Sequence, residues 1–131
     1  MKISWVIYNE LVRQARRELP NEACGYLLGT EETVTVNIPM TNADHSPEHF
    51  SFLPKEQFAV VRFARSQGLK VIGCWHSHPS TPSRPSEEDI RLAYDPLILY
   101  FILSLAEEIP VLNAFHIREG VVEKLPLVIE R

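Results

Sequence analysis

Hydrophobic and polar positions recur with two different periods along the chain, and these periods predict a series of helices and strands. In Ser4–Leu19 every fourth position from Ile7 onward is apolar, which is typical of a helix with one buried face. Pro20 ends this helix. The continuous apolar run Ala23–Leu28 predicts a buried strand, and the alternating, β-branched Thr33–Ile38 predicts the next one.

The middle of the chain begins with a polar, irregular stretch, Met40–His49, followed by Phe50–Leu53, which we expect to form a short strand. Pro54 suits the first position of a helix that runs to about Gln67 and ends at a glycine. The apolar stripe of this helix is expected to comprise Phe58, Val61 with Val60, and Ala64 or Arg65.

Lys70–Trp75 is an apolar run that predicts a strand, with two histidines placed where it ends. Three prolines between residues 79 and 85 disfavour a helix in the segment that follows. Ser86 is then expected to cap a short helix that runs to about Tyr94, because three acidic residues follow it in the first turn.

The last third of the chain predicts three more strands, Leu97–Leu105, Val111–Ile117 and Val121–Ile129, separated by polar turns. Pro126 makes the last of them an edge strand or an interrupted strand. Helices and strands thus follow one another along the whole chain. The fold class predicted by this order is α/β, with helices packed around one mixed or mainly antiparallel β-sheet.

Composition narrows the class of protein. The 131 residues suffice for one core, so we expect a single domain over residues 1–131, and 45% hydrophobic with 23% charged residues is typical of a soluble globular protein. A net charge of −4 without a Lys/Arg-rich run argues against a nucleic-acid partner. No apolar run reaches the ~18 residues of a membrane span, and the N-terminus lacks a secretory signal pattern. We therefore expect a cytoplasmic protein with no membrane partner.

Candidate chemistry is concentrated in residues 73–89. Side chains at positions i and i+2 of a strand point to the same side, so His76 and His78 can present both imidazoles to one point. Imidazole binds zinc, and a catalytic zinc site commonly has three protein ligands. Asp89 is the candidate for the third ligand, because a carboxylate in the first turn of a helix is held deprotonated.

The same residues also admit a purely structural interpretation. Ser86 and Asp89 have the spacing of a helix capping box, so Asp89 could serve only to cap the helix. Capping and metal binding are compatible, since Ser86 can supply the cap. Hydrolysis would further need a base, for which Glu22 at the edge of a buried strand is the candidate. From its position alone, Glu22 could equally be a solvated turn residue.

The chain resembles the JAMM (MPN+) zinc metalloprotease family, whose signature is a distant glutamate followed by H-x-H-P, six residues, S-x-x-D. Glu22, the run His76–Pro79, Ser86 and Asp89 match every position of that signature. The flanking sequences PNEACG, VIG and PS are similar to those of the small prokaryotic members. This resemblance implies a mixed sheet flanked by helices, similar to cytidine deaminases, although the deaminase signature itself is absent.

The resemblance also implies a role for each residue. His76, His78 and Asp89 would bind Zn²⁺, Glu22 would act as general base and then as proton donor, and Ser86 would stabilise the oxyanion. The family typically cleaves peptide or isopeptide bonds after the C-terminal Gly-Gly of a ubiquitin-like protein. The small prokaryotic members imply a sulfur-carrier protein as partner, with release of cysteine as one such reaction. The oligomeric state stays open.

Two other functions remain as alternatives. A non-catalytic MPN-type module would bind proteins without cutting them, although such members usually lack ligands that are all present here. A hydrolase of small peptides or amino-acid conjugates would need no protein partner. A small-peptide hydrolase would cut short peptides as fast as an intact carrier protein, and this comparison distinguishes it from a peptidase that recognises the carrier.

Overall fold

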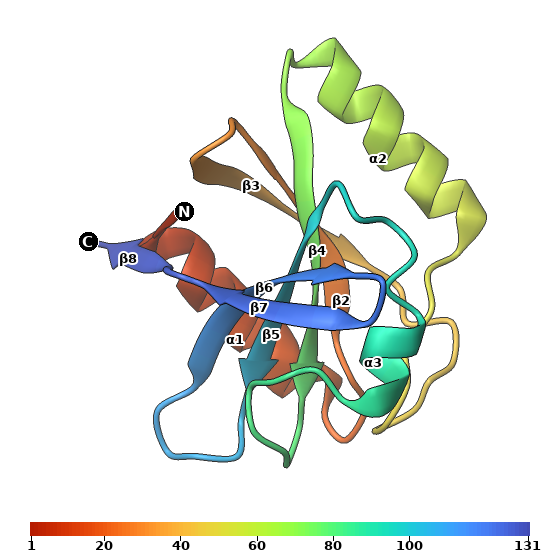
Figure 1. Ribbon diagram of the computed structural model, residues 1–131, viewed down its shortest axis with the longest axis vertical. Coiled ribbons are helices and arrows are strands. Elements are labelled where there is room, and N and C mark those ends of the chain that lie inside the picture. Colours follow the sequence, from red (N-terminus) through yellow and green to blue (C-terminus); the bar gives the residue numbers. More distant parts are fainter.

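An eight-stranded mixed sheet forms the centre of the protein in this computed structural model, which describes residues 1–131. In Figure 1 the sheet curls between α1, which lies behind the strands, and α2 and α3 on the right. The elements are β1 (Lys2–Ser4), α1 (Trp5–Glu18), β2 (Cys24–Gly29), β3 (Thr33–Met40), α2 (Pro54–Ser66), β4 (Lys70–His78), α3 (Glu87–Arg91), β5 (Leu99–Ser104), β6 (Val111–Arg118), β7 (Val121–Leu125) and β8 (Val128–Glu130).

The strand order across the sheet is β7-β6-β5-β4-β2-β3-β1-β8. Strand β4 lies near the middle, antiparallel to β2 and parallel to β5. Three of the seven pairings are parallel, because β1 also runs parallel to β3 and to β8. The predicted fold class, a mixed sheet flanked by helices, is confirmed.

Helix α1 covers one face of the sheet. Ser4 caps it by accepting a hydrogen bond from the backbone N–H of Ile7. Its apolar side packs on the largest core cluster, which includes Trp75 and Phe101. The predicted stripe is confirmed except for Leu19, which is 46% exposed. The helix ends at Glu18, so Leu19 has left the helical periodicity.

Helix α2 lies on the other face, and its predicted apolar stripe is only partly confirmed. Val60 and Ala64 face the sheet, whereas Phe58 and Val61 are 68% and 45% exposed. The sequence offers two apolar stripes on this helix, displaced around its axis, and either satisfies the helical period. Packing on β4 and the neighbouring cluster selects the narrower stripe, Val60 and Ala64.

Several element boundaries also differ from the predictions. Phe50–Leu53 forms no strand, since its aromatic rings pack on side chains of the sheet. Strand β4 continues beyond Trp75 to His78, because β5 pairs with it over its last six residues. Helix α3 is shorter than expected, and Pro126 divides the last strand into β7 and β8. Strand β1 was not predicted.

All three helices are too short or too polar to cross a bilayer.

Candidate active site

Strand β4 places the two histidines. His76 pairs with Cys24 of β2 and His78 with Ser104 of β5, so strands on both sides fix the backbone. The histidines are only 4% and 5% exposed. Ser77 points to the opposite face, where its Oγ accepts a hydrogen bond of 2.8 Å from the backbone N–H of Ala23. One strand therefore presents two imidazoles to a single side of the sheet.

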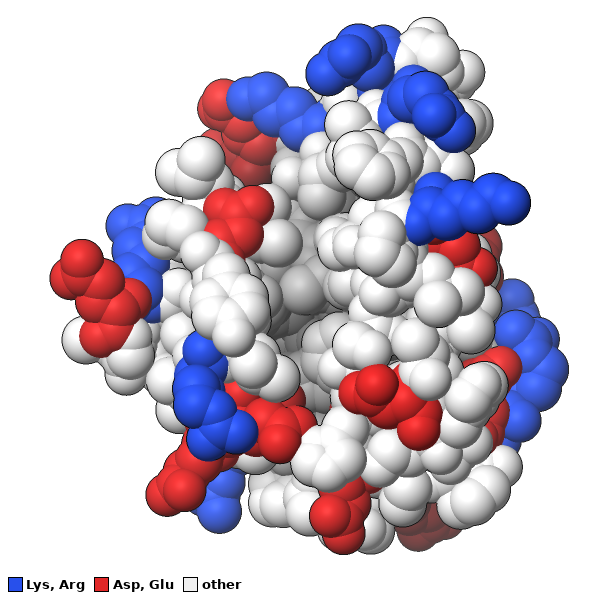
Figure 2. Space-filling view, turned by 90° about the vertical axis from the view of Figure 1, so that its right-hand side faces the viewer, with Lys and Arg blue, Asp and Glu red and all other residues white.

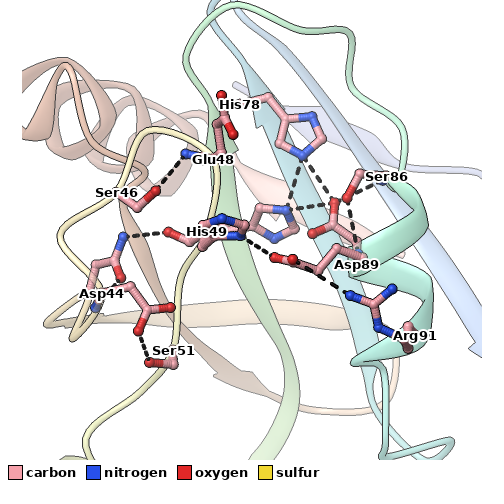
Figure 3. A network of polar contacts seen from close by, with 12 residues as sticks. Asp44, Ser46, Glu48, His49, Ser51, His78, Ser86, Asp89 and Arg91 are labelled. Carbon is pink, nitrogen blue, oxygen red and sulfur yellow. Dashed lines mark hydrogen bonds and ion pairs between the residues drawn. The ribbon is translucent and has the colours of Figure 1, made fainter.

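Helix α3 brings the carboxylate. Ser86 is its N-cap, and the capping box is complete: Ser86 Oγ accepts from the Asp89 N–H, and Asp89 Oδ2 accepts from the Ser86 N–H. The same Oδ2 lies beside both imidazoles. The two interpretations of Asp89 that the sequence left open are therefore compatible in the structure, with capping holding the carboxylate in place. Figure 3 shows His78 and Asp89 turned toward each other.

Three donor atoms form a nearly equilateral triangle. The distance from Asp89 Oδ2 is 3.1 Å to His76 Nε2 and 3.1 Å to His78 Nε2, and the two nitrogens are 3.2 Å apart. Ligand atoms of a tetrahedral zinc ion, bound at about 2.0–2.2 Å, lie about 3.3–3.6 Å from one another. The observed triangle agrees with this spacing within a few tenths of an ångström, so the residues fit zinc.

Proton affinities favour the metal-binding forms of Asp89 and His76, whereas the pKa of His78 shifts the other way. Burial opposes a charged Asp89, but hydrogen bonds with His76 and His78 outweigh it and hold the pKa of Asp89 well below its usual range. Burial lowers the pKa of His76. For His78, burial acts in the same direction, but hydrogen bonds to Asp89 and to the Pro82 carbonyl raise the pKa. An ionised carboxylate and a neutral imidazole are the forms that bind metal.

Neighbouring groups hold the histidine rings. His78 Nδ1 lies 2.9 Å from the carbonyl oxygen of Pro82, which fixes its Nε2 toward Asp89. The ring of Phe50 stacks on His76, with ring centroids 4.6 Å apart. The proline-rich loop and the loop before α2 therefore both contribute to ligand orientation. Sequence reasoning missed this role of Phe50, since the short strand expected there gives no indication that its ring contacts His76.

Glu22 lies two residues before β2 and is 4% exposed, so it is not the solvated turn residue that the sequence also allowed. Its Oε1 has no hydrogen-bond partner in the protein. Burial raises the pKa of Glu22 to about 8, with smaller effects from the charges of His78 and Asp89. A buried, unpaired carboxyl group beside a cluster of metal-type ligands has the environment of a general base.

Glu22 should make the stability of the metal-free protein depend on pH. Its pKa is 4.5 in the unfolded chain and about 8 when folded, so the folded state loses stability as pH rises between these values. We expect Glu22→Gln to be more stable than wild type at pH 9 by several kcal/mol, since each pKa unit corresponds to about 1.4 kcal/mol.

Urea unfolding at pH 4 and pH 9 measures this difference, which should be small at pH 4 because both states are then protonated. Glu48→Gln is the matched control, since Glu48 is exposed on the loop before α2. If wild type and Glu22→Gln differed in free energy of unfolding by the same amount at both pH values, Glu22 would not be buried and neutral.

A groove of about 470 Å³ lies on this face of the sheet, and His76 and Asp89 are among the residues that line it. Figure 2 shows it as a hollow with mostly uncharged walls. Besides Asp89, Glu88 and Asp95 are the acidic residues along it, and no Lys or Arg lines it. The apolar lining residues are Tyr26, Phe50, Phe52, Cys74, Leu92, Tyr94, Ile98, Tyr100, Ile102 and Ile117.

The segment 41–53 forms one side of the site and α3 forms the other, as Figure 3 shows. His49 Nδ1 contacts Glu88 Oε1 at 2.5 Å and joins the two sides. This hydrogen bond raises the pKa of His49. The sequence placed His49 in a solvated loop, which agrees with its half-exposed side chain, but gave no sign of the contact with α3.

Comparisons with known proteins agree with this geometry. Residues 6–118 match the family described as prokaryotic homologs of the JAB domain. The CysO-cysteine peptidase of Mycobacterium tuberculosis is 34% identical over 124 residues, covering 92% of this chain and 85% of that protein.

Two solved structures are also similar. Protein DSY2949 from Desulfitobacterium hafniense has a TM-score of 0.91 and 42% identity, covering 98% of this chain and 92% of its own. A structure described as "JAMM: A Metalloprotease-like Zinc Site in the Proteasome and Signalosome" has a TM-score of 0.62 and 25% identity, covering 100% of this chain and 98% of its own.

Proposed function

Because this chain belongs to the family of prokaryotic JAB-domain homologues and is a hydrolase of the JAMM type, we propose that it cleaves the bond after the C-terminal glycine of a ubiquitin-like or sulfur-carrier protein. The observation that carries the proposal is the triangle of donor atoms from His76, His78 and Asp89, next to the buried, unpaired carboxyl group of Glu22.

In the proposed reaction His76, His78 and Asp89 hold a zinc ion, which when bound supplies a water molecule with a pKa of about 7. The carboxylate of Glu22 accepts a proton from the attacking water and then gives it to the leaving nitrogen. Burial raises the pKa of Glu22 in the metal-free protein to about 8, and a general base works best with a pKa close to the operating pH. No second acid is needed, because the same group is regenerated at the end of each cycle.

Ser86 is proposed to stabilise the oxyanion. Its Oγ accepts a hydrogen bond from the Asp89 N–H, so its own hydroxyl proton is free to be donated elsewhere. The residue is exposed at the start of α3, next to the carboxylate of the donor triangle. A donor at this place can strengthen its bond as negative charge develops on the substrate oxygen.

The groove supports an extended protein tail as the substrate. His76 and Asp89 line it, and beside them glycine residues without side chains can bring a backbone carbonyl close to the metal site. The rest of its wall is mostly apolar. Apart from His76, the only ionisable side chains that line it are carboxylates. An acidic tail is therefore disfavoured, and an apolar tail that ends in two glycines fits.

Cysteine is the proposed leaving group. The relative named CysO-cysteine peptidase matches 92% of this chain. We place the reaction in the cytoplasm, since Cys24 and Cys74 are both free and buried, as expected for a reducing compartment.

The test is to incubate the zinc-loaded protein with carriers that end in Gly-Gly-Cys or Gly-Gly-peptide and to locate the cut by mass spectrometry. We expect cleavage after the second glycine. Changing that glycine to valine should lower kcat/KM about 100-fold, because a β-branched side chain displaces the reacting carbonyl. Equal rates on short peptides and intact carriers would instead favour a small-peptide hydrolase, and no cut in any Gly-Gly adduct would refute the proposal.

A further inference from the structure

The backbone of Glu22 is fixed by hydrogen bonds to the loop before α2 and not by strand pairing. Strand β2 begins only at Cys24, so no ladder of strand hydrogen bonds reaches Glu22. Its N–H instead donates to the carbonyl of Ser46 at 2.8 Å, and its carbonyl accepts from Asn42 Nδ2 at 3.0 Å. The carboxyl Oε1 makes no hydrogen bond. The position of this carboxyl group therefore depends on what holds the backbone.

Asn42 makes three hydrogen bonds with its side-chain amide and is only 7% exposed. Besides the bond to Glu22, Nδ2 donates to the carbonyl of His49 at 2.9 Å, and Oδ1 accepts from the backbone N–H of Asp44 at 3.0 Å. His49 directly precedes Phe50, which stacks on His76. One buried amide thus connects the candidate base to the loop that supports a metal ligand.

Only the side-chain amide of asparagine matches the three hydrogen-bonding partners at this position. The site needs two donors and one acceptor in a single plane, and the asparagine side chain supplies all three. An aspartate of the same shape would turn a carboxylate oxygen toward two carbonyl oxygens. An alanine would leave the buried carbonyl of Glu22 without its partner, which is costly in a buried environment.

We propose that Asn42 is a positioning residue of the reaction, which fixes the backbone of Glu22 so that its carboxyl group faces the attacking water and the leaving nitrogen. The inference rests on the proposed function, in which Glu22 carries the proton. Asn42 makes no hydrogen bond to His76, His78 or Asp89, so its direct effect is on the base, and it reaches a metal ligand only through the loop that carries Phe50.

The test compares Asn42→Ala and Asn42→Asp with wild type in the zinc-loaded protein. We expect kcat to fall about 10- to 100-fold, as for a misplaced catalytic group, with KM and zinc affinity changed less than about twofold. In a Glu22→Gln background the same changes should cause no further loss, because the residue through which Asn42 acts is already inactive. An equal loss of residual activity in both backgrounds would overturn the proposal in favour of a general structural role.

A second measurement does not depend on turnover. Amide hydrogen exchange at Glu22 and Ala23 should become about tenfold faster in Asn42→Ala, while exchange in the β4–β5 ladder stays unchanged. Asp44→Asn is the control, because the Asp44 side chain bonds only Ser51, and it should match wild type in rate and exchange. If the wild-type protein cuts no carrier, the proposed function fails, but amide hydrogen exchange still tests the role of Asn42. Unchanged amide exchange at Glu22 in Asn42→Ala would overturn the inference that Asn42 positions Glu22.

Discussion

Replacing Glu22 with glutamine is expected to lower kcat by about 10²- to 10⁴-fold, the range typical of a lost general acid–base. Glutamine keeps the size of the side chain but cannot accept the proton of the attacking water or return it to the leaving nitrogen. KM for a carrier ending in Gly-Gly-Cys should change little, because Glu22 lies outside the lining of the groove. Steady-state kinetics on that carrier, with zinc content measured in parallel, give both quantities.

The same variant separates an enzyme from a binding module. Glu22→Gln should bind one zinc ion as wild type does, since the three donor atoms come from other residues. Glu48→Gln, an exposed change in the loop before α2, should keep full activity. If Glu22→Gln still supports carrier processing in cells, the function is protein binding and Glu22 is not the base.

Replacing His78 with alanine is expected to abolish both zinc binding and turnover. His78 supplies one of three donor atoms, and two remaining ligands do not hold a catalytic zinc ion against the ordinary competition of water and buffer. Zinc at 1,000 times its Kd stabilises a protein that binds it only when folded by about 4.1 kcal/mol. This increase in stability should appear in wild type and be absent in His78→Ala.

Thermal unfolding with and without zinc measures this zinc-dependent increase in stability in both proteins. In wild type, a chelator should remove activity and added zinc should restore it. His116→Ala is the matched histidine control, because His116 lies on β6 beside Glu123. A zinc-dependent rise in Tm that survives in His78→Ala would place the ion elsewhere on the chain.

The candidate site was largely predictable from the sequence because its chemistry depends on short-range spacing. In a strand, positions 76 and 78 share a side whatever the rest of the fold, and Asp89 at the third position of α3 follows from Ser86 as cap. Glu22 was different. Its residue type and position alone also fitted a solvated turn, and only the family signature pointed to it.

Features that depend on contacts between distant segments were not predictable. Strand β1 has three residues and a single buried side chain, Ile3, and it exists because β3 and β8 pair with it. The buried side of α2 depends on where the sheet lies, which the helical period does not contain. Asn42 likewise gave no signal, since a polar residue in a polar loop is ordinary until the buried carbonyl of Glu22 is found against it.

The hydrogen bond from the backbone N–H of Ala23 to Ser77 Oγ joins positions 54 residues apart in the sequence. During synthesis the base leaves the ribosome long before the zinc ligands do, and neither group alone can hydrolyse a peptide bond. Under the proposed mechanism, catalytic competence arises only when β2 and β4 pair, which joins two segments that are distant in the sequence. Under that mechanism, a chain in which β2 and β4 are not paired does not hold the base beside the zinc ligands and does not hydrolyse peptide bonds.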